Sequence, residues 1–133
     1  MVITDPNQPD NPIVFVNAAF CKLTSFTRME ILGQNCRFLQ GPETEMEAVA
    51  QVRDAIARRV PIEIELRNYK KSGEIFWNRL LVAPVFDRGG AVTHFFASQF
   101  DVTLEKDRLV RLQEDRDALQ VEVHQRSDAL NRS

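Results

Sequence analysis

The sequence of 133 residues predicts an α+β domain that is followed by one long C-terminal helix. Three observations lead to this fold class. Helix-capping residues recur through the first half of the chain. From Pro61 to Asp101 apolar and polar residues alternate between short turns, as in antiparallel strands. Beyond Thr103 the chain is highly charged, and its apolar residues recur at helical spacing.

The length fits one domain with an appendage. We expect residues 1–103 to form the folded core and residues 104–133 to form a helical extension. The net charge of -2 gives no electrostatic reason to expect nucleic acid or an anionic membrane as a partner. Two cysteines make no disulfide framework, and no stretch reads as a membrane span or a signal peptide. We therefore expect a cytoplasmic protein.

The N-terminal part of the sequence predicts a hairpin and two short helices. Val2–Thr4 and Ile13–Val16 read as strands, and the loop between them is rich in turn-forming residues. Asn17 is a good N-cap for the helix that follows the second strand. Thr27 caps the next helix, which Gly33 ends.

The segment from Gly33 to Gly41 places a thiol, a guanidinium and several amides between two apolar stretches. A lone cysteine such as Cys36 is usually a small buried hydrophobic residue. Its neighbours Asn35, Arg37 and Gln40 favour a chemical role, because such polar groups need partners if they are buried. We expect the segment to wrap a polar ligand, with Cys36 against it and Arg37 near an anionic group such as a phosphate.

A longer helix is predicted after Pro42. Thr44 and Glu47 have the spacing of a capping box at its start. Its apolar stripe consists of Val49, Val52, Ala55 and Ile56. Arg53 lies beside this stripe, and it is either an ordinary solvated charge or a second cation for the anion that Arg37 meets.

Each of the three strands that follow places one carboxamide in its inward-facing row: Asn68, Asn78 and Gln99. The rest of these rows is apolar and consists of Ile62, Ile64, Leu66, Phe76, Leu80, Val82, Phe95 and Ala97. If the rows share one face of a sheet, the amides converge on a pocket that suits a flat heterocycle with alternating C=O and N–H groups. No cluster of metal-ligating residues and no glycine-rich phosphate loop is evident.

The opposite face of the last strands is also apolar, with Trp77, Leu81, Phe96 and Phe100. We expect a helix or a second subunit to cover it, although such strands can also pack under loops. In the extension, residues spaced alternately by three and four form a heptad seam: Leu109, Leu112, Arg116, Leu119, Val123, Arg126 and Leu130. This seam predicts a dimerising coiled coil, and the alternative is a solvated tail.

The run from Gly33 to Pro42 resembles the signature of the LOV (light, oxygen, voltage) photoreceptor domains, a branch of the PAS superfamily. The resemblance covers about residues 2–103. Companion segments that also match are Thr4-Asp5-Pro6, Pro9-Asp10-Asn11-Pro12, Asn68-Tyr69, Phe76-Trp77-Asn78, Gln99 and Asp101-Val102-Thr103. A signature of this length with spaced companions is far more specific than a lone short motif.

The resemblance implies a PAS fold, which is a five-stranded antiparallel sheet with helices on one face and flavin mononucleotide (FMN) between them. Cys36 would be the photoreactive thiol, and Arg37 and Arg53 would bind the phosphate. Asn68, Asn78 and Gln99 would bind the edge of the ring, and Asn35 and Gln40 would contact the ribityl chain and ring. The pocket would be lined by Val2, Thr4, Asn11, Leu39, Val52, Ile56, Leu66, Leu80, Val82, Phe95 and Ala97.

The resemblance also implies a photocycle without enzymatic activity. FMN would be held noncovalently in the dark, and blue light would drive a reversible bond between Cys36 and flavin carbon C4a. Gln99 and the last strand would pass the signal to the C-terminal helix, a homodimer and possibly a C-terminal effector domain. Ala97 stands where the family usually has glycine. The alternatives are a flavin-free PAS-type dimerisation module and a flavin redox sensor.

Overall fold

The computed structural model describes residues 1–132, with side chains described for residues 1–120. The chain divides into two compact units, of which the first is Met1–Val102 and the second begins at Thr103. The elements in chain order are β1 (Val2–Thr4), β2 (Ile13–Val16), α1 (Ala18–Thr24), α2 (Arg28–Ile31), the 3-10 helix η1 (Cys36–Leu39), α3 (Met46–Arg58), β3 (Ile62–Tyr69), β4 (Ile75–Phe86), β5 (Val92–Asp101) and α4 (Thr103–Arg132).

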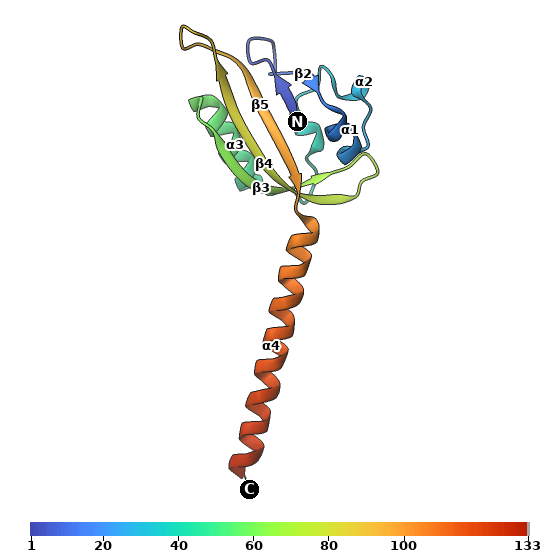
Figure 1. Ribbon diagram of the computed structural model, residues 1–133, viewed down its shortest axis with the longest axis vertical. Helices are drawn as coiled ribbons and strands as arrows, with labels where there is room; N and C mark the ends of the chain where they lie inside the picture. The colour runs from blue at the N-terminus through green and yellow to red at the C-terminus, as the bar shows by residue number, and fades with distance from the viewer. Residues whose placement is uncertain (133) are drawn as a thin grey trace. The chain divides into compact units, whose positions relative to one another are not determined.

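The first unit is a five-stranded sheet with the strand order β2-β1-β5-β4-β3 (Figure 1). All of its neighbouring strands run antiparallel. Between β2 at one edge and β3 at the other, the chain forms α1, α2, η1 and α3, which pack on one face of the sheet. The predicted fold class, including the long C-terminal helix, is therefore confirmed.

The strand register brings the three inward rows onto the same face of the sheet. Leu66 of β3 pairs with Asn78 of β4, and Leu80 of β4 pairs with Gln99 of β5. Because directly paired residues point to the same side of a sheet, the carboxamides of Asn78 and Gln99 share a face with Leu66 and Leu80. Asn68 lies two residues beyond Leu66 and joins them.

Local capping explains where the first helices begin. Asn17 Oδ1 accepts a hydrogen bond from the backbone N–H of Phe20 at 3.0 Å, as predicted. Thr27 and Glu30 form a capping box around the start of α2. Gly33 follows this helix with a φ of +87°, a conformation that glycine adopts without strain.

The capping box predicted from Thr44 and Glu47 is wrong. The N-cap of α3 is Glu45, whose side chain makes no capping hydrogen bond. The Thr44 hydroxyl accepts from the N–H of Gly41 at 3.0 Å and donates to the carbonyl of Arg67 at 2.7 Å. A tertiary contact with β3 therefore takes the hydroxyl that a local cap would use.

Two buried clusters form the core. The larger one joins β1, β2, α1, α2 and η1 to β4 and β5 and consists of Val2, Ile13, Val16, Phe20, Ile31, Leu39, Val82, Phe95 and Ala97. The smaller one, where α3 meets β3, consists of Ala48, Val49 and Leu66. Residues of both clusters line the cavity described below, so the same packing that stabilises the domain forms the walls of its pocket.

The outer face of the sheet carries the apolar residues that the sequence predicted. Of these, Leu81 and Phe100 are exposed, Phe96 is half-buried, and the ring of Trp77 lies 5.2 Å from the guanidinium of Arg67. Phe15 of β2, which was not predicted, is exposed as well. In the second unit, α4 is a single helix. The seam residues Leu109, Leu112 and Leu119 are exposed, whereas Val123, Arg126 and Leu130 lie outside the residues with described side chains.

The backbone of Gly41 lies close to the ring of Tyr69, and a substitution at this position tests the packing between them. A Cβ at position 41 would lie 2.2 Å from Cε2 of Tyr69, whose hydroxyl accepts the N–H of Glu43 at 2.9 Å. We expect Gly41→Ala to lower the free energy of unfolding by about 1–3 kcal/mol, because the ring must move. Denaturant unfolding measures this change. Gly89→Ala is the control, since its nearest neighbour is the flexible Asp87 carboxylate at 3.3 Å, and equal losses in the two variants would contradict the expectation.

Candidate functional site

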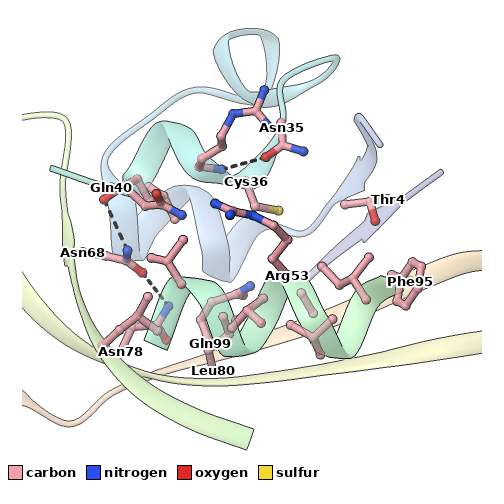
Figure 2. A pocket seen from close by; sticks show the side chains of 18 of the residues that line it. Thr4, Asn35, Cys36, Gln40, Arg53, Asn68, Asn78, Leu80, Phe95 and Gln99 are labelled. Atoms are coloured by element: carbon pink, nitrogen blue, oxygen red, sulfur yellow. Dashed lines mark hydrogen bonds between the residues drawn. The ribbon is translucent and has the colours of Figure 1, made fainter. Parts of the chain in front are cut away.

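A cavity of about 230 Å³ lies between the helices and the inner face of the sheet (Figure 2). Voids larger than a water molecule are few in protein interiors, so a cavity of this size is more than a packing defect. Its lining consists of Thr4, Asn11, Phe20, Asn35, Cys36, Arg37, Leu39, Gln40, Val49, Val52, Arg53, Ile56, Leu66, Asn68, Asn78, Leu80, Val82, Phe95, Ala97 and Gln99.

The structure brings together every predicted site residue except Val2 around this cavity. Val2 is fully buried in the larger core cluster, where it pairs with Val16 and Ala97. Phe20 and Val49 line the cavity although they were not predicted to do so. The sequence had placed Val49 in the apolar stripe of α3, whereas nothing in it distinguished Phe20 from an ordinary core residue. The binding role of the lining residues remains a prediction.

The carboxamides of the inner sheet face form a short chain of hydrogen bonds. Asn78 Nδ2 donates to Asn68 Oδ1 at 2.9 Å, and Asn68 Nδ2 donates to the carbonyl of Leu39 at 3.3 Å (Figure 2). Both asparagines are buried. These two hydrogen bonds fix the orientation of both side-chain amides and leave the side-chain oxygen Oδ1 of Asn78 without a partner.

Four buried side-chain oxygens in the described part of the chain have no hydrogen-bond partner: Thr4 Oγ1, Asn11 Oδ1, Asn78 Oδ1 and Gln99 Oε1. All four belong to residues that line the cavity. An unsatisfied buried polar group costs roughly 1–3 kcal/mol, so their gathering in one place indicates a ligand that supplies donors. A flat heterocycle with N–H groups on its edge fits this set, and the apolar lining fits its faces.

Cys36 begins η1, directly after its N-cap Asn35. Asn35 Oδ1 accepts the N–H of Arg37 at 3.1 Å, and Asn35 Nδ2 donates to the carbonyl of Asp10 at 2.7 Å. Burial raises the pKa of the Cys36 thiol to about 11. At neutral pH the sulfur therefore keeps its proton, and Cys36 is a weak nucleophile in the dark.

Two arginines contribute positive charge to the cavity. Arg53 extends from α3 (Figure 2), and Arg37 belongs to η1 and forms an ion pair with Asp10. The hydrogen bond with Arg37 lowers the pKa of Asp10, and the same bond raises the pKa of Arg37. Guanidinium groups bind phosphate through several parallel donors, so this pair could hold the phosphate of a mononucleotide.

The described residues contain no group of three or more side chains arranged to hold a metal ion. Among these described residues, no helix has both the length and the apolar character that crossing a membrane requires.

Comparisons with known proteins identify the family. The model of the PAS domain family matches residues 1–104. The blue-light-activated histidine kinase of Brucella ovis is 51% identical over 131 residues, which are 98% of this chain and 27% of that protein. The corresponding protein of Brucella anthropi is 49% identical over 130 residues, which are 98% of this chain and 26% of that protein. The chain thus spans about a quarter of the length of these curated relatives.

Solved structures agree with this match. The dark structure of the blue-light photoreceptor Aureochrome1 LOV superimposes with a TM-score of 0.77 at 40% identity, covering 87% of this chain and 84% of that one. The light-state structure of the same photoreceptor domain gives a TM-score of 0.77 at 40% identity, covering 86% and 89%. The chain therefore belongs to the PAS family and is a LOV domain, as the sequence predicted.

Proposed function

We propose that this chain senses blue light by binding FMN noncovalently in the cavity in the dark and forming a reversible bond between the sulfur of Cys36 and flavin carbon C4a under illumination. The observation that carries the proposal is the gathering of four unpartnered polar oxygens in a cavity that also contains a protonated thiol. The relatives described above as blue-light photoreceptors support it.

The lining residues divide into groups that suit the parts of FMN. Asn68, Asn78 and Gln99 offer donors and acceptors to the polar edge of the ring. Arg37 and Arg53 offer charge to the phosphate, and Asn35 and Gln40 offer amides to the ribityl chain. Apolar side chains for the ring faces come from both walls of the cavity: Leu39, Val52, Ile56, Leu66, Leu80, Val82, Phe95 and Ala97.

Cys36 supplies both atoms that the light reaction needs. Flavin, when bound, supplies the absorption of blue light and an electrophilic carbon. Cys36 would give its proton to flavin nitrogen N5 and its sulfur to C4a. The S–H bond and the C4a=N5 π bond would break as the N5–H and S–C4a bonds form, with no net change in charge. The raised pKa of the thiol keeps that proton in place until illumination.

Gln99 is the residue that links this reaction to the rest of the chain. Its amide carries a donor and an acceptor, and rotation of the side chain exchanges them when a proton arrives on the neighbouring ring atom. Its strand β5 ends at Asp101, and the chain continues through Val102 into α4. The backbone N–H of Val102 donates to the carbonyl of Trp77 at 2.9 Å. A change at Gln99 can therefore shift the population of states at the start of α4.

The output is a homodimer that pairs through α4 and the outer face of the sheet. Phe15, Ile3, Phe96 and Ala83 are directly paired across β2, β1, β5 and β4, which makes one apolar row over four strands. Phe15 is exposed and the other three are half-buried, and partly exposed apolar rows of this kind are typical of interfaces. The chain itself is not an enzyme. It acts as the sensor of an effector domain that follows it, a role consistent with the histidine kinases among its relatives.

The first test is Cys36→Ala. We expect the purified wild-type protein to show a flavin absorption band that bleaches under blue light and returns in the dark. The variant should keep the band and its fluorescence without bleaching, because it lacks the sulfur that forms the bond. Cys21→Ala is the control and should bleach like the wild type, since Cys21 does not line the cavity.

Each other outcome of this test has a definite meaning. Bleaching in Cys36→Ala would contradict the assigned role of the thiol. A yellow wild-type protein that does not bleach would favour the redox sensor. A colourless protein that takes up no added flavin would favour the dimerisation module.

The second test is Gln99→Leu, which keeps the size of the side chain and removes its hydrogen bonds. We expect the light-induced change in amide hydrogen exchange of residues 103–120 to fall severalfold while the bond to Cys36 still forms, because the reaction is no longer transmitted. The control is Ser98→Ala, since Ser98 pairs with Leu81 and points to the outer face. A full response in Gln99→Leu would rule out this route.

The third test concerns pairing through α4. We expect light scattering to give a dimer at micromolar concentration. Leu112→Asp should shift it strongly toward monomer, because a carboxylate would enter the apolar seam. Val110→Asp is the matched control, since Val110 is similarly exposed but lies off the seam. A wild-type monomer, or equal effects of the two variants, would count against the coiled coil.

A further inference from the structure

The ion pair between Asp10 and Arg37 engages a cation that the proposed function assigns to phosphate. We propose that Asp10 sets how strongly the site prefers a phosphorylated flavin over the unphosphorylated form, by acting as an internal anion that competes for Arg37. This inference rests on the proposed function and concerns the charge of the ligand rather than its ring.

The pair is held by its surroundings and is not a chance contact of two surface side chains. Asp10 and Asn11 both have left-handed backbone conformations, with φ values of +67° and +48°. The Asn35 side chain holds the backbone of both members of the pair. Its Nδ2 donates to the carbonyl of Asp10, and its Oδ1 accepts a hydrogen bond from the N–H of Arg37. The backbone of the loop before β2 therefore positions the Asp10 carboxylate next to Arg37.

Arg37 lines the cavity and is also exposed to solvent. It lines the cavity, yet its side chain is 57% exposed and that of Asp10 is 60% exposed. Asp10 uses one guanidinium nitrogen, Nη2, so the other donors remain for an anion. Any phosphate on Arg37 then lies next to the Asp10 carboxylate or displaces it. Both possibilities cost binding free energy for a charged ligand and none for a neutral one.

The charge of Asp10 outweighs any help it gives in positioning Arg37. An exposed ion pair does little to fix a side chain, because water competes for both groups. The backbone of Arg37 is already held by Asn35. Arg53, the second cation of the cavity, makes no ion pair with the described residues, so the carboxylate on Arg37 is the acidic group that directly opposes the ligand.

The test is the selectivity of the whole chain after its flavin has been removed. Fluorescence titration with FMN and with riboflavin gives two dissociation constants, and their ratio isolates the phosphate. We expect Asp10→Asn to raise the preference for FMN by roughly twofold to fivefold, the size of effect that exposed charges produce. The affinity for riboflavin should stay unchanged, and added salt should shrink the gain.

The substitution suits the site, because asparagine tolerates the left-handed backbone at position 10 and still offers Arg37 an oxygen. Glu74→Gln is the matched control: it removes an exposed carboxylate that pairs with Lys70, away from the cavity lining, and should leave the ratio unchanged.

An unchanged ratio in Asp10→Asn would overturn the inference. So would a lower ratio, which would mean that Asp10 positions Arg37, or an equal weakening of both ligands, which would mean that the loop only closes the cavity. A wild-type chain that binds neither flavin would instead overturn the proposed function and this inference with it. The two failures are distinguishable, because in the first the wild-type chain still binds flavin.

Discussion

The unsatisfied carboxamides on the inner face of the sheet are the constraint around which this domain is built. Asn78 and Gln99 sit in rows that are otherwise apolar, and each has a buried oxygen without a partner. A protein stabilised only by its core would replace such residues with leucine or valine, because each unpaired oxygen costs free energy. Their presence makes sense when a ligand completes the hydrogen bonds, so that folding and binding stabilise the same interface between helices and sheet.

The cavity also decides what its thiol can do. The burial that gives Cys36 a pKa of about 11 keeps it unreactive in the dark, whereas a low-pKa thiolate would react with any electrophile or oxidant that entered. The apolar wall and the protonated thiol thus have one physical cause, which is the exclusion of water. The proposed light-gated reaction needs a group that stays inert until illumination, and this environment provides it.

Part of the fold and of the site could be predicted from short-range periodicity, whereas most of the cavity lining came from the resemblance to LOV domains. The two-residue period of β3, β4 and β5 placed Asn68, Asn78 and Gln99 in the inward rows of their strands, and the strand register puts these rows on one face. Asn17 and Thr27 acted as helix caps because their partners lie within three residues.

Features that depend on distant parts of the chain could not be found in this way. The Thr44 hydroxyl bonds to Arg67 on another element, so its local capping signal was misleading. The exclusion of Val2 from the cavity and the inclusion of Phe20 depend on how β1 and α1 pack. The pair of Asp10 and Arg37 joins residues 27 positions apart and has no periodic signature.

In the proposed photocycle, the protonated Cys36 thiol becomes bonded to carbon when the domain absorbs blue light. Infrared difference spectroscopy of the S–H stretch tests it most directly, with Cys36→Ala identifying the band that belongs to this residue. The account predicts an S–H band at neutral pH in the dark that disappears under blue light and returns at the rate of the visible absorption. A band that is absent in the dark, or one that persists in the light, would contradict it.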